Sequence, residues 1–253
     1  MKIANRTFIV SGGASGLGKA CVEELVKNGA NVSILDMNED GQALASELGS
    51  SAKFFVCDVL DSASITKAVQ GTVEWAQQTN KAIGGVIPAA GILDRNGSAF
   101  NLDDVDFVLG VNLRGTIDLV RQAVEEIAKA DVDADGERGI VIMVASSAAF
   151  DGQKGQISYS ASKGAVTAMT LPMARDLSRY SIRCVTIAPS LFETRMTSMM
   201  SGKVRKSLEA TFEHPKRAGR PDEFAHLVNA VISNSMLNAT VIRLDGGSRP
   251  SKI

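Results

Sequence analysis

The chain has 253 residues, of which 45% are hydrophobic and 22% are charged, and its formal net charge is −1. This charge balance argues against nucleic acid or an anionic membrane as a partner. No apolar run approaches the roughly 20 residues that a membrane span needs. The length suits one α/β domain, so we expect a single domain over residues 1–253.

Short β-branched runs alternate with longer helical patterns along the chain, beginning with a strand-like run and a helix near 17–29. The predicted strands are 7–12, 30–36, 52–59, 83–91, 138–147, 182–190 and 240–247. Continuous apolar strands separated by helices indicate a parallel sheet with helices on both faces. Right-handed crossovers then give a doubly wound, Rossmann-type α/β fold with a seven-stranded parallel sheet.

The N-terminus and the cysteines bear on compartment and metal binding. The first predicted strand begins almost at once, without a signal peptide or an arginine-rich transit segment. Cys21, Cys57 and Cys184 show no metal-ligand spacing, and His214 and His226 have no cysteine or histidine partner nearby. We therefore expect reduced thiols, no metal site and a cytoplasmic protein, although a mature protein of the mitochondrial matrix would look the same.

The stretch SGGASGLGKA (11–20) follows the first strand and opens the first helix. Gly12, Gly16 and Gly18 let the backbone turn tightly and approach a pyrophosphate, and the helix N-terminus supplies free N–H groups and a partial positive charge. The spacing is G-x3-G-x-G, and a glycine-rich loop alone is a weak signal. The strand before it and the helix after it favour a dinucleotide site.

Asp36 ends the second predicted strand, 18 residues beyond Gly18. Its carboxylate can accept hydrogen bonds from both hydroxyls of an adenosine ribose and would repel a 2′-phosphate. No lysine or arginine follows until Lys53, which favours NAD(H) over NADP(H), although Lys19 lies close by. Asp58, after the third strand, is placed to meet the adenine. Either aspartate could instead cap a helix.

The stretch SYSASKG (158–164) places Tyr159 four residues before Lys163, on the same face of a helix. A free phenol titrates near ~10, and a nearby cation favours phenolate, so we expect Lys163 to lower the pKa of Tyr159. Tyr159 could then remove a proton from an alcohol or donate one to a carbonyl. Ser146, at the end of the fifth strand, could hold the substrate oxygen. Asn112 could hold a water that relays protons to Lys163.

The segment from about 190 to 220 is irregular and methionine-rich, and it follows the C-terminal end of a strand, where ligands bind in open α/β sheets. We expect a lid over a substrate; a partner-contacting or disordered loop is the alternative. Met196, Met199 and Met200 suit an adaptable apolar pocket, although methionines at this spacing can also be simple packing.

Six stretches occur in the order and spacing of the short-chain dehydrogenase/reductase family: SGGASGLG, CDV, PAAG, VNLRGT, YSASK and IAPSLFET, with a serine 13 residues before the tyrosine. Essentially the whole chain resembles this family. Within it, the chain is most similar to the 3-hydroxyacyl-CoA dehydrogenase type 2 group, also called 17β-hydroxysteroid dehydrogenase type 10. That similarity lies in ASSAAFDGQKGQISYSASKGAV, MTLPMARDLSRYSIRCVTIAPSLFET and VIRLDGG.

The resemblance implies a catalytic tetrad of Asn112, Ser146, Tyr159 and Lys163. It also implies that Thr194 binds the nicotinamide carboxamide and that Lys163 holds the nicotinamide ribose. The NAD contacts implied in this way are Ser15, Leu17, Asp36, Asp58, Val59, Ala89, Gly91, Phe192 and Thr194.

By this resemblance the chain is expected to be an NAD(H)-dependent oxidoreductase that interconverts a secondary alcohol and a ketone. The expected substrate is a 3-hydroxyacyl-CoA or similar hydroxy compound, and the expected assembly is a homotetramer. One alternative is a reductase of a steroid-like or polycyclic ketone in secondary metabolism. Another is a catalytically idle nucleotide-binding scaffold, against which the presence of all four tetrad residues argues.

Three positions depart from the family pattern. Pro88 replaces an asparagine, and because proline has no N–H, strand four must be stabilised differently there. Ser190 and Glu193 replace glycines near the expected nicotinamide end. The added carboxylate of Glu193 could repel an acyl-CoA or redirect specificity.

Overall fold

The structure is a computed structural model that describes residues 1–94, 101–198, 200 and 202–249. The strands are β1 (Thr7–Ser11), β2 (Asn31–Asp36), β3 (Ala52–Val56), β4 (Ile83–Pro88), β5 (Gly139–Val144), β6 (Ile182–Pro189) and β7 (Val241–Leu244). The helices are α1 (Gly16–Lys27), α2 (Asp40–Leu48), α3 (Ser62–Gln78), α4 (Leu102–Leu109), α5 (Thr116–Ile127), α6 (Ile157–Ser178), α7 (Arg195–Ser198), α8 (Gly202–Glu209) and α9 (Pro221–Ser233).

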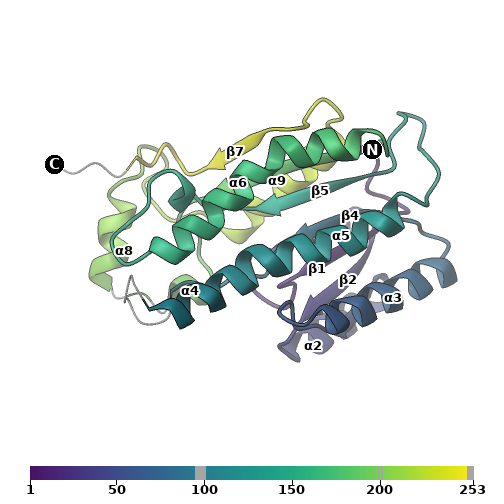
Figure 1. Ribbon diagram of the computed structural model, residues 1–253, viewed down its shortest axis with the longest axis horizontal. Helices are drawn as coiled ribbons and strands as arrows, with labels where there is room; N and C mark the ends of the chain where they lie inside the picture. The colour runs from purple at the N-terminus through teal and green to yellow at the C-terminus, as the bar shows by residue number, and fades with distance from the viewer. Residues whose placement is uncertain (95–100, 199, 201, 250–253) are drawn as a thin grey trace.

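All seven strands pair in parallel in one sheet, in the order β3-β2-β1-β4-β5-β6-β7 (Figure 1). This arrangement confirms the predicted doubly wound, Rossmann-type fold. The chain builds outward from β1 through β2 to β3, then returns to β4 on the other side of β1. The strand order therefore reverses between β1 and β4, which is where open α/β sheets form a ligand crevice.

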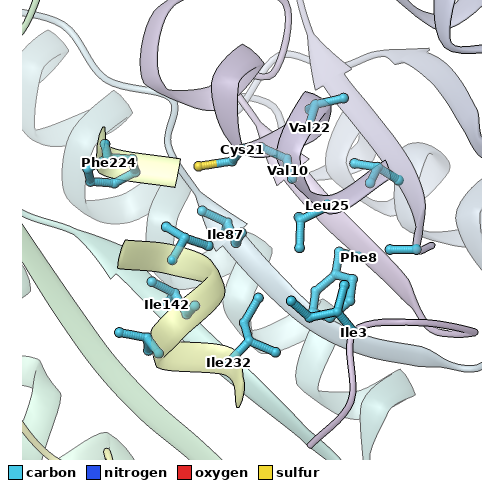
Figure 2. Close-up of a cluster of buried hydrophobic side chains, with 14 of the residues drawn as sticks. Ile3, Phe8, Val10, Cys21, Val22, Leu25, Ile87, Ile142, Phe224 and Ile232 are labelled. Carbon is cyan, nitrogen blue, oxygen red and sulfur yellow. The ribbon is translucent and has the colours of Figure 1, made fainter. Parts of the chain in front are cut away.

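Two hydrophobic cores lie on opposite faces of the sheet, because successive strand residues point to opposite sides. On β1, Phe8 and Val10 join the core that α1 and α9 cover, whereas Ile9 joins the core under α3, α5 and α6. Figure 2 shows the first core, in which Leu25 of α1 and Ile232 of α9 pack with Phe8. Since both faces are covered, the central strands are buried on both sides and are mainly apolar, as the continuous apolar runs indicated.

Several predicted strands are longer than the observed ones. The fourth was predicted over 83–91 and ends at Pro88, and the fifth was predicted over 138–147 and ends at Val144. Their last predicted residues leave the sheet at its carboxyl edge, where Ala89 and Ser146 line a cavity. Apolar composition alone does not show at which residue a strand ends and leaves the sheet.

No helix in the described part of the chain is both long and apolar enough to cross a membrane.

Candidate active site

A cavity of about 670 Å³ lies at the carboxyl ends of the strands, with walls from both sides of the β1–β4 reversal. Every residue predicted to contact the cofactor lines it, and so do the predicted catalytic side chains apart from Asn112. The predicted residues in the wall are Gly12, Ser15, Gly16, Leu17, Gly18, Asp36, Asp58, Val59, Ala89, Gly91, Ser146, Tyr159, Lys163, Phe192 and Thr194.

The loop between β1 and α1 forms a tight cradle in this wall. Gly12 has φ +66, and a Cβ there would lie 2.8 Å from the backbone of Ala90. A Cβ on Gly18 would lie 2.2 Å from the Gly12 carbonyl oxygen. Ser15, the N-cap of α1, makes no side-chain cap bond, so the first-turn amides remain available to an anion. The loop therefore fits the pyrophosphate of a dinucleotide.

Asp36 presents its carboxylate to the cavity from the end of β2. Its Oδ2 accepts the Ala14 N–H at 3.0 Å, and its Oδ1 accepts the Asn38 N–H at 3.0 Å. The N-cap of α2 is Glu39, so Asp36 is not a cap for that helix. The two amides hold the Asp36 carboxylate at the end of β2, the position at which we expect the adenosine ribose to bind.

Asp58 also faces the cavity, and it does not cap α3. Its Oδ1 accepts the Leu60 N–H at 2.9 Å in a local turn. Asp61 is the N-cap of α3, with its Oδ1 accepting the Ala63 N–H at 2.9 Å. The capping alternative considered for Asp58 is therefore wrong.

Tyr159 belongs to the first turn of α6, and Lys163 follows one turn later. The Ser146 side chain, just after β5, accepts the Ala148 N–H at 3.1 Å and lies close enough to the phenol to lower the pKa of Tyr159. The Lys163 Nζ lies 5.8 Å from the centre of the Tyr159 ring and donates to the Val144 carbonyl oxygen at 2.8 Å. The structure thus brings the three side chains together at one place in the cavity wall.

The pKa of Tyr159 shifts in the direction opposite to the prediction. Burial raises the pKa of the phenol, the hydrogen bond with Ser146 lowers it, and the Asp94 charge raises it, with a net increase. Burial also lowers the pKa of Lys163 to about 8. The expectation that Lys163 lowers the pKa of Tyr159 is therefore wrong for the protein's own groups, because the loss of hydration around the phenolate dominates.

Asn112 lies behind the cavity wall, in a π-helical turn over Gly110–Gly115 between α4 and α5. Its Oδ1 accepts the Ile92 N–H at 2.8 Å, and its Nδ2 donates to the Ile92 carbonyl at 2.9 Å and to Ser162 Oγ at 3.1 Å. Its side chain thus ties the loop after β4 to α6. A water relay from Asn112 to Lys163 stays a prediction.

Pro88 ends β4 without an N–H, and the next two residues secure the strand instead. The Ala89 N–H donates to the Ser11 carbonyl at 3.1 Å, and the Ala90 N–H reaches Ser11 Oγ at 3.3 Å. The loop is therefore held to β1 by hydrogen bonds that need no amide at Pro88.

Glu193 and Ser190 have different surroundings. Ser190 lines the main cavity, whereas Glu193 lines an adjoining hollow beside α1. The Glu193 carboxylate is exposed and accepts from Arg205 of α8 at 3.0 Å. The suggestion that Glu193 repels a substrate in the main cavity is thus not supported by its position.

The predicted lid contains α7 and α8, and two of its methionines, Met196 and Met200, line the cavity. Met199 lies outside the described residues. Thr194 packs close to Gly16, since a Cβ on that glycine would lie 3.3 Å from the threonine methyl group. The start of the lid therefore contacts the glycine loop.

Sequence reasoning missed several cavity residues. Gln153 and Gln156 lie in the stretch between Ser146 and Tyr159, and this position was a usable signal. Asp151 lies in the same stretch, and Met37 and Arg195 directly follow the predicted Asp36 and Thr194. Other cavity residues come from segments with no local motif: Leu93, Phe107, Leu208 and Ser248. Asp94 was also missed, although its carboxylate contacts the backbone of Tyr159.

Comparisons with known proteins agree with this site. The family model described as short chain dehydrogenase matches residues 6–204. The chain is 43% identical over 249 residues to 3-hydroxyacyl-CoA dehydrogenase type-2 of Bos taurus, covering 95% of this chain and 94% of that protein. It is 30% identical over 251 residues to acetoacetyl-CoA reductase of Synechocystis, covering 96% of each.

Among solved structures, 3-hydroxyacyl-CoA dehydrogenase type-2 from Mycobacterium avium matches with a TM-score of 0.89 and 34% identity. The match covers 98% of this chain and 97% of that one. The chain therefore belongs to the short-chain dehydrogenase family, and it is an oxidoreductase that acts on CH–OH groups with a nicotinamide cofactor.

Proposed function

We propose that the chain uses NAD(H) to interconvert a secondary alcohol and a ketone, and that its substrate is a 3-hydroxyacyl thioester. The observation that carries this proposal is the grouping of Ser146, Tyr159 and Lys163 in the wall of the cavity that also contains the glycine loop. Two relatives whose names specify CoA thioesters support the substrate class.

In this proposal the bound cofactor supplies or accepts a hydride, and the protein moves the proton. Tyr159 donates its hydroxyl proton to the carbonyl oxygen during reduction and removes it from the alcohol during oxidation. Ser146 holds the same oxygen by a hydrogen bond. Because the pKa of Tyr159 is raised, the phenol is protonated at neutral pH and ready to act as the acid. Lys163, buried and anchored on Val144, places its cation beside the ring.

The preference for NAD(H) over NADP(H) rests on the charges around Asp36. Its carboxylate is fixed at the cavity by two backbone amides. Lys19 is the lysine that follows the glycine loop in the sequence. Its ammonium group pairs with Glu23 at 3.8 Å, and it does not line the main cavity. Among the described residues that line the cavity, the cations are Lys163 and Arg195, and both come from segments remote from β2 in the chain. A 2′-phosphate beside Asp36 would therefore be repelled by a fixed carboxylate.

The remaining cavity wall suits an acyl chain. Apolar side chains from the loop after β4, from α4 and from the lid line it, and two glutamines add hydrogen-bonding groups. Methionine is flexible and adapts to chains of different length. The apolar lining residues in these segments are Leu93, Phe107, Met196, Met200 and Leu208.

We also propose a homotetramer. Ile117 of α5 and Leu171 of α6 are 42% and 44% exposed, and all four residues of the edge strand β7 are only partly buried. Exposed apolar side chains on neighbouring helices favour association. Light scattering should give four times the mass of the chain, and a monomer at all concentrations would refute this assembly.

The test of function measures the loss of NADH absorbance with acetoacetyl-CoA as substrate. The same assay is then run with ketones that carry no CoA group, including a bicyclic ketone. We expect NADH oxidation to be fastest with acetoacetyl-CoA. Faster turnover of the bicyclic ketone would instead support a reductase of polycyclic substrates. NADH binding without turnover of any substrate would support the idle scaffold.

A further inference from the structure

Arg195 is a cation in the wall of the main cavity, at the start of the lid. It follows Thr194 as the first residue of α7, and it lines both the main cavity and the adjoining hollow beside α1. Its backbone carbonyl accepts from Ser198 Oγ at 2.8 Å. Its guanidinium group forms no ion pair or hydrogen bond with any residue that the structure describes. Because an arginine stays charged and carries several N–H donors, this group is available to an anionic ligand.

The other cations around the two hollows already have partners. The Lys163 ammonium donates to the Val144 carbonyl oxygen at 2.8 Å. In the adjoining hollow, Lys19 and Arg205 each pair with a glutamate, at 3.8 Å and 3.0 Å. Among the described residues that line either hollow, Arg195 is therefore the cation that a ligand can engage without breaking an existing contact.

The backbone holds Arg195 beside the glycine loop. Thr194 packs against that loop, because a Cβ on Gly16 would lie 3.3 Å from the threonine methyl group. The Thr194 N–H donates to Thr197 Oγ1 at 2.9 Å, which fixes the turn into α7. The Cα of the next residue is about 3.8 Å further along the chain. Arg195 therefore begins one residue away from a contact with the loop that fits a pyrophosphate.

The charge of the cavity wall also favours a cation at this place. Three carboxylates line the main cavity and two cations oppose them, so the described wall has one excess negative charge: Asp36, Asp58 and Asp151 against Lys163 and Arg195. A bound dinucleotide adds the negative charges of its pyrophosphate. The amides of the glycine loop donate hydrogen bonds to it but carry no net charge. A guanidinium beside the loop supplies both a charge and paired donors.

We propose that Arg195 binds the pyrophosphate of the nicotinamide cofactor from the lid, alongside the amides of the glycine loop. The phosphates of a CoA thioester have the same chemistry, but the contact of Thr194 with Gly16 favours the cofactor. This inference rests on the proposed use of NAD(H). It gives the lid a part in holding the cofactor, because a bound Arg195 ties α7 to the loop between β1 and α1.

The variants separate charge from geometry. Arg195→Gln removes the charge, and Arg195→Lys keeps it but loses the planar fork that matches a pyrophosphate. Arg205→Gln is the matched control, because it removes the same charge from the adjoining hollow at a residue that does not line the main cavity. Each protein is titrated with NADH, followed by the fluorescence of the cofactor. ADP-ribose and adenosine are then measured as competitors of NADH.

We expect Arg195→Gln to bind NADH about 10-fold more weakly, with Arg195→Lys in between. ADP-ribose, which has the pyrophosphate but no nicotinamide, should lose the same factor. Adenosine, which has no phosphate, should keep its wild-type dissociation constant. Arg205→Gln should change these constants by no more than about twofold. Added salt should weaken NADH binding more in the wild type than in Arg195→Gln. An unchanged NADH affinity in Arg195→Gln, or an equal loss for adenosine, would overturn the proposal.

A second set of measurements distinguishes the two sources of phosphate. With NADH saturating, KM is measured for acetoacetyl-CoA and for the acetoacetyl thioester of N-acetylcysteamine, which has the same reacting group without phosphates. We expect Arg195→Gln to leave the ratio of the two KM values unchanged. A rise in KM for acetoacetyl-CoA alone, at unchanged NADH affinity, would overturn the proposal and assign Arg195 to the substrate.

The binding titrations need no substrate, so they test the inference even if neither thioester is turned over. A wild type that binds no NADH would refute the proposed function together with this inference. Unchanged affinity in Arg195→Gln, beside a wild type that binds NADH, would refute the inference alone.

Discussion

The ammonium nitrogen of Lys163 lies 5.8 Å from the centre of the Tyr159 ring and donates to the Val144 carbonyl oxygen at 2.8 Å. Its pKa is lowered to about 8 by burial, so the fold holds this cation at a cost in stability. Lys163 is 5% exposed, and the carbonyl is its hydrogen-bond partner within the described chain. Such a cost is expected where a buried charge serves a reaction.

Stability should therefore depend on pH through Lys163. The folded-state pKa is below the unfolded one, so the unfolded chain binds the extra proton between about 8 and about 10.4. The cost is fully present below that window and is relieved as pH rises through it. Between about pH 7 and about pH 9.5, this group alone should raise the free energy of unfolding by about 2 kcal/mol.

The measurement compares urea unfolding of the wild type with Lys163→Met at both pH values. Methionine cannot titrate, so the stability of the wild type relative to Lys163→Met should improve by that amount at the higher pH. Lys19→Met is the control for an exposed lysine and should show no such trend. A difference between wild type and Lys163→Met that is constant with pH would contradict the lowered pKa.

Ser146 should affect both rate and pH dependence. Its hydrogen bond lowers the pKa of Tyr159, so Ser146→Ala should raise that pKa further and move the rise of alcohol oxidation to higher pH. Loss of one donor to the reacting oxygen should also reduce kcat roughly 100-fold. Steady-state rates across a pH series check both effects. A fall in kcat without a shift in the pH profile would mean that Ser146 binds the substrate but does not influence the pKa of Tyr159.

The layout of the fold was predictable from the sequence because the pattern of buried strands is local. The run Thr7–Ser11 is buried at every position and has three apolar residues at its centre, as expected for a strand of a parallel sheet covered on both faces. The glycine loop and Asp36 were found for the same reason, since each lies at a strand end that the pattern marks.

The parts that the sequence did not predict depend on tertiary contacts. Nothing in the sequence around Asp94 shows that its carboxylate meets the Tyr159 amide 65 residues later. The direction of the Tyr159 pKa also depends on burial, and the spacing to Lys163 suggested the opposite sign. The ion pair between Glu193 and Arg205 likewise forms across the lid.

Asp36 should determine cofactor choice. Asp36→Ala removes the carboxylate that would accept the ribose hydroxyls, and hydrogen bonds to a charged group contribute about 1.5–3 kcal/mol. We expect NADH to bind roughly 10-fold to 100-fold more weakly and the gap between NADH and NADPH to narrow. Fluorescence titration with each cofactor measures both. Asp40→Ala, an exposed carboxylate on α2, is the control; an unchanged cofactor ratio in Asp36→Ala would refute the assigned role.

The proton-transfer role of Tyr159 is tested most directly by Tyr159→Phe, assayed for NADH oxidation with acetoacetyl-CoA. The phenyl ring keeps the packing but has no hydroxyl, so we expect kcat to fall by about 10²–10⁴-fold while NADH still binds. Tyr180→Phe changes the other tyrosine of the chain, which is 41% exposed, and should keep full activity. Turnover by Tyr159→Phe at the wild-type rate would contradict the account.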